Sequence, residues 1–238
     1  MTPAAGRTMI VAHMTDPSFE EKMRVEWNAR AQKSYMQYTS GTQTEKEEDY
    51  LKSAERDTAP ILRYLDGADT RTWKALDVGC GVGRLIQVLA PRFAEVHGVD
   101  VSDEMLNLGR ERLKPFPNVQ LHRLEGTDLK PFPDRTFQIM WSYSVFYHMP
   151  RTLYYGYLKE LSRVMAPGGQ LMYQLAQTYT LRRWLNAVFR VEPDAKDTNV
   201  RRHYTKGHLR ALAEANGFEV LHCEPGQGHD LWCHWRRR

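Results

Sequence analysis

A glycine-rich segment in the first half of the chain constrains its fold more than any other feature. An apolar run leads into Asp77, and Gly79, Gly81 and Gly83 follow at alternate positions. Glycines between a strand and a helix let the backbone approach a ligand closely and leave amide groups free to bind it. Dinucleotide-binding loops have the spacing G-x-G-x-x-G, whereas Arg84 takes the place of the last glycine here. With Asp77 in front, this loop favours a ligand that carries a positive group over a pyrophosphate.

Around this loop, short apolar runs alternate with segments that have helical periodicity. This alternation predicts an α/β protein whose sheet is mostly parallel and carries helices on both faces. Strands are expected at residues 73–78, 95–99, 119–124, 137–144, 170–175, 218–222 and 231–235. Helices are expected at residues 85–93, 103–113, 152–165 and 206–216, the third stopped by the Pro-Gly-Gly at 167–169.

The segments outside this alternation predict a cap and a lid. Residues 1–15 are expected to be a disordered tail, 16–66 an N-terminal helical cap, and 67–238 the core, with a lid inserted at 177–205. The cap is predicted as two helices, the first ending at Gly41 and the second kinked at Pro60. In the lid, five apolar side chains fall at helical spacing: Leu181, Trp184, Leu185, Val188 and Phe189.

Composition narrows the class of protein. The chain has 238 residues, 42% of them hydrophobic, and no window approaches the ~20 apolar residues of a membrane span. Its three cysteines cannot form a disulfide framework, which predicts a reducing, cytoplasmic location. The net charge of +4 is confined to the lid and to the arginines at 236–238, so the body is slightly acidic and a nucleic-acid partner is not expected.

Five ordered motifs give the chain a family resemblance. It resembles the class I S-adenosylmethionine-dependent methyltransferases, and within them the small-molecule methyltransferase superfamily with its D-x-G-x-G-x-G loop. The resemblance implies a Rossmann-like, doubly wound, seven-stranded sheet with an antiparallel last strand. The motifs lie at residues 77–83, 98–102, 126–129, 142–144 and 161–169. The chain departs from the pattern at Gln138, where the family commonly has a peripheral Asp.

The resemblance also implies roles for individual residues toward S-adenosylmethionine. Asp77 and the backbone of Gly79, Cys80, Gly81 and Gly83 would hold the methionine part. Asp100 would accept from both ribose hydroxyls. The other implied contacts are Val101 and Met105 on the adenine faces, Thr127, Asp128 and Leu129 at the adenine edge, and Ser142 at the ammonium or sulfonium end. Arg30 on the cap is a candidate for the cofactor carboxylate, and an exposed helix arginine is the alternative.

The acceptor side is expected after the fourth strand, because open α/β sheets bind ligands at strand carboxyl ends. His148 is the candidate general base, and Tyr143 and Tyr147 are the candidate polar lining; the alternative for all three is structural packing. The candidate lid residues are Trp27, Tyr35, Arg183, Trp184, His203 and Tyr204. The basic insertion fits an anionic acceptor or, alternatively, a solvated basic face.

Two other functions compete with a small-molecule methyltransferase. A methyltransferase that acts on RNA or protein gains from the basic segments and loses because no RNA-binding module is recognisable. A non-catalytic homologue that only binds the cofactor is the second alternative. A metal site is not expected, because His229, Cys233 and His234 lie on a predicted hairpin whose alternate residues face opposite sides.

Overall fold

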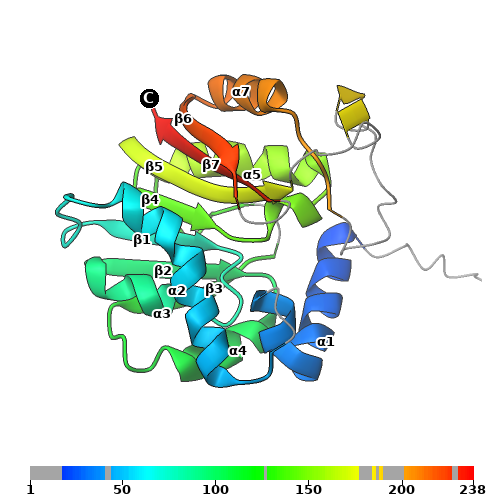
Figure 1. Ribbon diagram of the computed structural model, residues 1–238, viewed down its shortest axis with the longest axis vertical. Helices are drawn as coiled ribbons and strands as arrows, with labels where there is room; N and C mark the ends of the chain where they lie inside the picture. The colour runs from blue at the N-terminus through cyan, green and yellow to red at the C-terminus, as the bar shows by residue number, and fades with distance from the viewer. Residues whose placement is uncertain are drawn as a thin grey trace, which may run out of the picture.

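A twisted sheet of seven strands, in the order β3-β2-β1-β4-β5-β7-β6, forms the centre of the protein (Figure 1). The computed structural model describes residues 18–40, 44–125, 128–176, 184–185, 188–189, 201–226 and 230–238. The strands are β1 (Lys74–Val78), β2 (Glu95–Asp100), β3 (Val119–Arg123), β4 (Phe137–Ser142), β5 (Met165–Ala176), β6 (Phe218–Pro225) and β7 (Asp230–Arg237). Strands β1 to β5 pair in parallel, and β7 runs antiparallel to both β5 and β6. The predicted fold class, including the antiparallel last strand, is confirmed.

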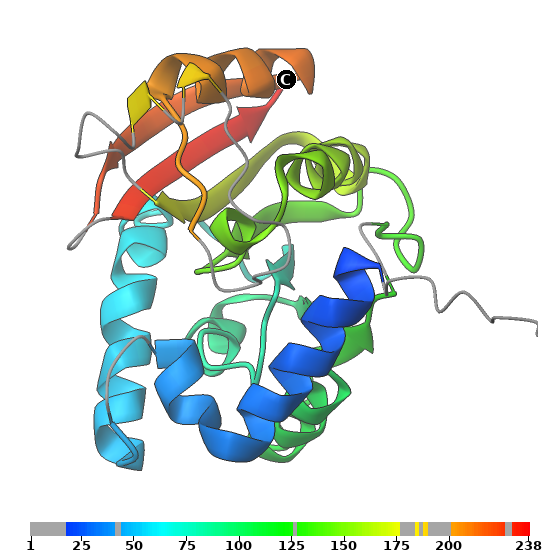
Figure 2. The ribbon, with the colours of Figure 1, turned by 90° about the vertical axis from the view of Figure 1, so that its right-hand side faces the viewer.

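Helices cover both faces because alternate strand residues point to opposite sides of the sheet. On β1, Leu76 and Val78 join one buried cluster with α5 (Arg151–Val164) and α7 (Lys206–Ala215). Ala75 joins the other cluster, with α2 (Glu47–Tyr64), α3 (Ile86–Leu89) and α4 (Asp103–Arg112). Figure 2 shows these two helical layers on either side of the sheet. The core is therefore two apolar layers that share one sheet.

Several element boundaries differ from those expected. Strand β5 begins at Met165, five residues before the start expected at 170, and helix α5 ends at Val164, one residue before its expected end. The helix expected at 85–93 is shorter: α3 has four residues and passes into the 3₁₀ turn η1 (Ala90–Arg92). Pro91 lies in that turn, and because proline has no backbone N–H it cannot continue an α-helical ladder.

The N-terminal helices lie beside the core. Helix α1 (Phe19–Ser40) is interrupted at Ser34, whose backbone is extended (φ −170°, ψ 89°), and helix α2 continues through Pro60 to Tyr64. After the interruption, the Tyr35 ring meets the Tyr50 ring edge-on at 5.7 Å between centroids. The division into cap, core and lid stays a prediction, and residues 1–17 lie outside the described part of the chain. Among the described residues, no helix combines the length and apolarity that crossing a membrane requires.

Candidate active site

A cleft lies where β1, β2 and β4 end. The strand order reverses between β1 and β4, and ligands of open α/β sheets bind at such a reversal. Helix α1 covers this edge (Figure 2). Seven of the residues predicted to contact a cofactor border this cleft: Asp77, Gly79, Cys80, Gly81, Asp100, Val101 and Met105. Trp27, Tyr143 and His148, predicted for the acceptor side, border it too.

The glycine loop can only turn as it does with glycine at two of its positions. Gly79 has φ +75° and Gly83 has φ +74°, a region that L-residues with side chains rarely adopt. A Cβ on Gly79 would lie 2.3 Å from Cγ2 of Val145, and one on Gly83 would lie 2.3 Å from Cδ1 of Leu113. The loop is thus packed through its own backbone against Val145, which follows β4, and Leu113, which directly follows α4.

The substitution Gly79→Ala is expected to lower the melting temperature by about 2–10 °C, because it adds both backbone strain and a contact with Val145. Gly168→Ala is the matched control: its φ is also +75°, but nothing lies within 4 Å of the added Cβ. Thermal unfolding of both variants separates the two causes. Equal destabilisation by the two variants would show that Val145 imposes no constraint on the loop.

Asp100 is held by the backbone on both of its carboxylate oxygens. The N–H of Gly81 donates to Oδ2 at 2.8 Å and the N–H of Ser102 donates to Oδ1 at 2.9 Å. Burial raises the pKa of Asp100, and these backbone N–H groups oppose the rise. The Ser102 hydroxyl accepts from the Met105 N–H at 3.1 Å and donates to Asn28 of α1 at 2.7 Å. The acid, the start of α4 and the covering helix therefore form one connected unit.

Asp77 is the most strongly perturbed acid of the cleft. It is 3% exposed on β1, and burial, reinforced by the Asp100 carboxylate, raises its pKa to about 7. The carboxyl therefore keeps a proton in the folded protein at pH values where it has lost it in the unfolded chain. The Asp77 carboxyl is therefore mostly neutral below about pH 7 and mostly an anion above it.

This proton predicts a pH-dependent stability in the ligand-free protein. The folded state binds one more proton than the unfolded state between about pH 4 and pH 7, so the free energy of unfolding falls as pH rises through this window, by about 1.4 kcal/mol per pH unit. The substitution Asp77→Asn removes this decrease in the free energy of unfolding, because an amide does not titrate. Its advantage in melting temperature over wild type is expected to grow from pH 5 to pH 7 and then stay constant, whereas the exposed Asp66→Asn gives a flat difference. An Asp77→Asn advantage that shrinks with pH would contradict the assignment.

The three candidate acceptor-side residues are not all brought together. His148, in the 3₁₀ turn η2 (Phe146–His148), borders the cleft with its ring 6.2 Å from that of Trp27. Tyr143 also borders it, and burial raises its pKa. Tyr147 points elsewhere: its ring is buried under Arg201, with the guanidinium 4.8 Å from the ring centroid. Only His148 and Tyr143 face the same space.

Other predicted site residues lie around the cleft without being part of its described lining. Asp128 pairs with Lys130 at 2.7 Å, and the Leu129 N–H donates to Glu160 at 2.9 Å. The Ser142 hydroxyl donates to the Val78 carbonyl at 2.8 Å. Gly83 packs beneath the loop, as described above. Their predicted contacts with a cofactor stay predictions, and Thr127 lies outside the described residues.

Of the candidates from the cap and lid, Trp27 borders the cleft, and the others that the structure describes lie outside its lining. Arg30 bonds to Glu26 at 2.9 Å and stacks over Trp27 at 4.7 Å, and the Tyr35 hydroxyl accepts from Arg112 at 3.1 Å. Trp184 is 48% exposed. The His203 carbonyl accepts from Arg151 at 3.1 Å, and the buried Tyr204 packs edge-on against Tyr154. Arg183 lies outside the described residues.

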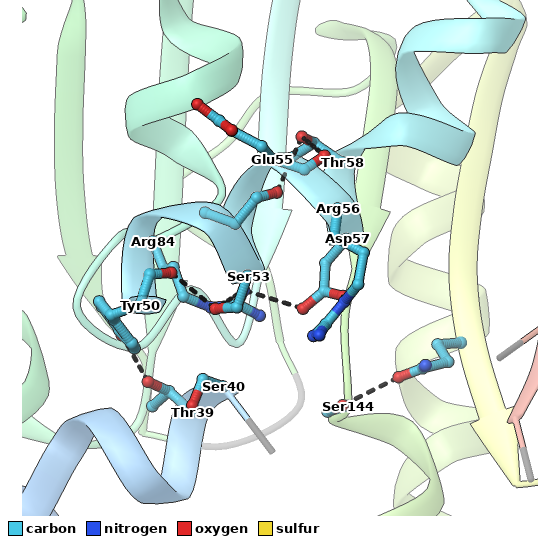
Figure 3. A network of polar contacts seen from close by, with 12 residues as sticks. Thr39, Ser40, Tyr50, Ser53, Glu55, Arg56, Asp57, Thr58, Arg84 and Ser144 are labelled. Atoms are coloured by element: carbon cyan, nitrogen blue, oxygen red, sulfur yellow. Dashed lines mark hydrogen bonds and ion pairs between the residues drawn. The ribbon is translucent and has the colours of Figure 1, made fainter. Parts of the chain in front are cut away.

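Sequence reasoning missed a buried ion pair at the inner wall of the cleft. Arg84 borders the cleft and pairs with Asp57 of α2 at 2.8 Å, and both side chains are at most 5% exposed (Figure 3). Only one residue of the pair was noticeable in the sequence: Arg84, which takes the place of a glycine in the glycine motif. Asp57 gave no such signal: a charged residue in an amphipathic helix is normally exposed.

Comparisons with known proteins agree with this geometry. Residues 75–169 match the family model of a methyltransferase domain. The chain is similar to demethylmenaquinone methyltransferases, with 38% identity over 99 residues for that of Tropheryma whipplei (42% of this chain, 40% of that protein) and 34% over 119 residues for that of Bacillus subtilis (48% of each). The match thus spans less than half the length of these relatives.

Solved structures extend the likeness to nearly the whole fold. Magnesium protoporphyrin IX methyltransferase from Synechocystis has a TM-score of 0.67 at 16% identity, covering 92% of this chain and all of that one. Geranyl diphosphate C-methyltransferase from Streptomyces coelicolor has a TM-score of 0.63 at 14% identity, covering 94% of this chain and all of that one. Residues 75–169 are therefore similar to a methyltransferase domain, and the chain as a whole has the fold of these solved methyltransferases.

Proposed function

We propose that this protein is an enzyme that transfers a methyl group from S-adenosylmethionine to an O, N or S atom of a small-molecule acceptor and releases S-adenosylhomocysteine. The observation that carries the proposal is a pair of carboxylates, the buried Asp77 and the partly buried Asp100, at the ends of adjacent strands beside a loop of left-handed glycines. The family match over residues 75–169 supports the same type of reaction.

The residues at the cleft fit S-adenosylmethionine part by part. The backbone holds both oxygens of Asp100, and each oxygen keeps a further lone pair that can accept from a ribose hydroxyl. Val101 and Met105 offer apolar side chains beside it for a base. Gly79 has no room for a side chain, so its backbone is the surface that a ligand meets. Asp77 supplies a carboxylate for the ammonium group of an amino acid.

The acceptor side has a simpler task. S-adenosylmethionine, when bound, supplies a methyl group that its sulfonium already activates. The chain has to hold the acceptor in line, exclude water and, for a protonated acceptor, remove one proton. Met23, Trp27, Met149 and Leu153 give the cleft an apolar wall, and His148 is the titratable side chain beside that wall.

The names of the similar proteins support a small-molecule acceptor. One acts on demethylmenaquinone, one on magnesium protoporphyrin IX and one on carbon of geranyl diphosphate, as their names state. All three acceptors are small molecules with large apolar parts, which suits the apolar wall of this cleft. A screen of acceptors for this protein therefore includes carbon nucleophiles besides phenols, carboxylates, amines and thiols.

Two measurements test the proposal. Calorimetric titration of the purified protein with S-adenosylmethionine and S-adenosylhomocysteine is expected to give one site per chain. Mass spectrometry of the acceptor panel with labelled cofactor then detects methyl transfer. Absence of binding at millimolar cofactor would refute the proposal, whereas binding with no transfer to any acceptor would favour a non-catalytic protein.

His148→Ala is expected to lower turnover about 10²–10⁴-fold with an acceptor that arrives protonated, since general-base catalysis contributes that much. The affinity for S-adenosylhomocysteine should change less than twofold, because His148 is not among the residues predicted to contact the cofactor. An acceptor that is already ionised at the assay pH is the internal control and should keep most of its rate. Unchanged turnover with the protonated acceptor would remove His148 as the base.

A further inference from the structure

We infer that Arg84, held in place by Asp57, binds the carboxylate of the amino-acid part of S-adenosylmethionine. This inference rests on the proposed function and adds to it a recognition residue that was not among the predicted cofactor contacts. It replaces Arg30 in that role.

The guanidinium of Arg84 is fixed and incompletely satisfied. Its Nη1 donates to the Ser53 hydroxyl at 3.0 Å and pairs with Asp57 at 2.8 Å (Figure 3). Within the part of the chain that the structure describes, its Nε and Nη2 are buried and have no hydrogen-bond partner. A guanidinium carries five N–H donors in a planar fork, and buried donors without partners are costly. Since Arg84 borders the cleft, a ligand in the cleft is the natural partner for them.

The charged groups around Arg84 favour the binding of an anion. Asp57 also accepts from Arg56 Nε at 2.8 Å, so one carboxylate faces two guanidinium groups. The ring of Tyr143 lies 5.2 Å from the Arg84 guanidinium and stabilises the cation without neutralising it. Arg56 is 41% exposed, so the Asp57 carboxylate is shared between one buried and one partly exposed guanidinium, and the three charges sum to +1. A carboxylate matches both this charge and the fork geometry of the guanidinium.

The position of Arg84 on the chain identifies which carboxylate fits. Arg84 directly follows Gly83, so it lies at the same loop as Asp77 rather than at α4, where Val101 and Met105 lie. Arg84 also acts on Asp77, since its charge lowers the pKa of that carboxyl. The carboxyl of Asp77 and the guanidinium of Arg84 lie at one end of the cleft, where they complement the ammonium and the carboxylate of an amino acid. Arg30 already bonds to Glu26 and stands outside the described lining.

The test compares ligands that differ only in the carboxylate. Dissociation constants are measured by calorimetry for S-adenosylhomocysteine and for its decarboxylated analogue, with wild type, Arg84→Lys and Arg84→Met. Wild type is expected to prefer the carboxylate-bearing ligand at least tenfold. Arg84→Met should weaken S-adenosylhomocysteine binding about 10- to 100-fold and change binding of the analogue less than threefold. Arg84→Lys keeps a cation beside Asp57, and with it the fold, and should lose part of the preference.

The outcomes separate this inference from the proposed function. If wild type binds neither ligand, the proposed function fails and the inference fails with it. If wild type binds S-adenosylhomocysteine but Arg84→Met and Arg84→Lys weaken both ligands equally, Arg84 is only structural and the inference alone is overturned. The inference is also overturned if Arg30→Met, and not Arg84→Met, loses the preference for S-adenosylhomocysteine over its decarboxylated analogue. It is overturned as well if Arg84→Met keeps that preference and only raises the KM for the acceptor. Arg110→Met, on the exposed side of α4, is the control and should leave both affinities unchanged.

Discussion

Replacing Asp100 with Asn is expected to weaken the binding of S-adenosylhomocysteine at least 100-fold. The carboxylate accepts from the N–H groups of Gly81 and Ser102 with different oxygens, and an amide offers only one oxygen. The NH₂ group would face one of the two backbone donors, which would distort the glycine loop, and one ribose hydroxyl would lose its acceptor. Each charge-assisted hydrogen bond lost is worth about 1.5–3 kcal/mol, so two of them exceed a factor of 100.

Calorimetry with S-adenosylhomocysteine measures this loss directly. Asp103→Asn is the matched control: Asp103 lies three residues further along, at the start of α4, and forms a 3.4 Å ion pair with Arg123. Its affinity should stay within twofold of wild type. An Asp100→Asn protein that binds within threefold of wild type would show that this carboxylate does not contact the ligand.

Replacing Asp57 with Ala is expected to have the largest effect on stability. It leaves the Arg84 guanidinium buried without its carboxylate, which costs about 3–5 kcal/mol. For a chain of this length that corresponds to a fall in melting temperature of about 6–20 °C. Asp69→Ala removes an acid of an exposed ion pair and should shift the melting temperature by a degree or two at most.

A second variant shows whether charge or packing causes the loss. Asp57→Leu combined with Arg84→Met replaces the pair by apolar side chains and should recover most of the stability. The protein would then be stable but, by the inference above, poor at binding a carboxylate. If Asp57→Ala cost no more than Asp69→Ala, the pair would not be buried as the structure shows.

Most of the sheet could be predicted because its signals are local. Each buried strand is a short apolar run with turn residues beside it, and the glycine loop fixes the position of β1 and α3 in the order. Boundaries were less accurate where local signals compete: β5 starts at Met165 because pairing with Phe137 of β4 extends it through the Pro-Gly-Gly. Sheet pairing there outweighs the turn preference of those residues.

The parts that could not be predicted depend on contacts between distant residues. No periodicity links Arg84 to Asp57, or Asn28 to Ser102, because the partners lie on separate helices and loops. Tyr143 and Tyr147 follow the same strand, but a 3₁₀ turn begins between them, so spacing alone does not say which of the two faces the cleft. Helix α1 is interrupted at Ser34, and neither neighbour of Ser34 is a proline or glycine that would predict an interruption there.

The position of β7 has a consequence for how the chain acquires its fold during synthesis. Strand β6 is made before β7, but in the described part of the chain its only strand partner is β7, which sits between it and β5. Until β7 emerges from the ribosome, β5 presents an open edge and β6 has nothing to pair with, and such edges invite association with other chains. The nascent protein is therefore most vulnerable to aggregation in the interval between α7 and β7, and a premature stop there would leave β5 with an open edge and β6 unpaired on both sides.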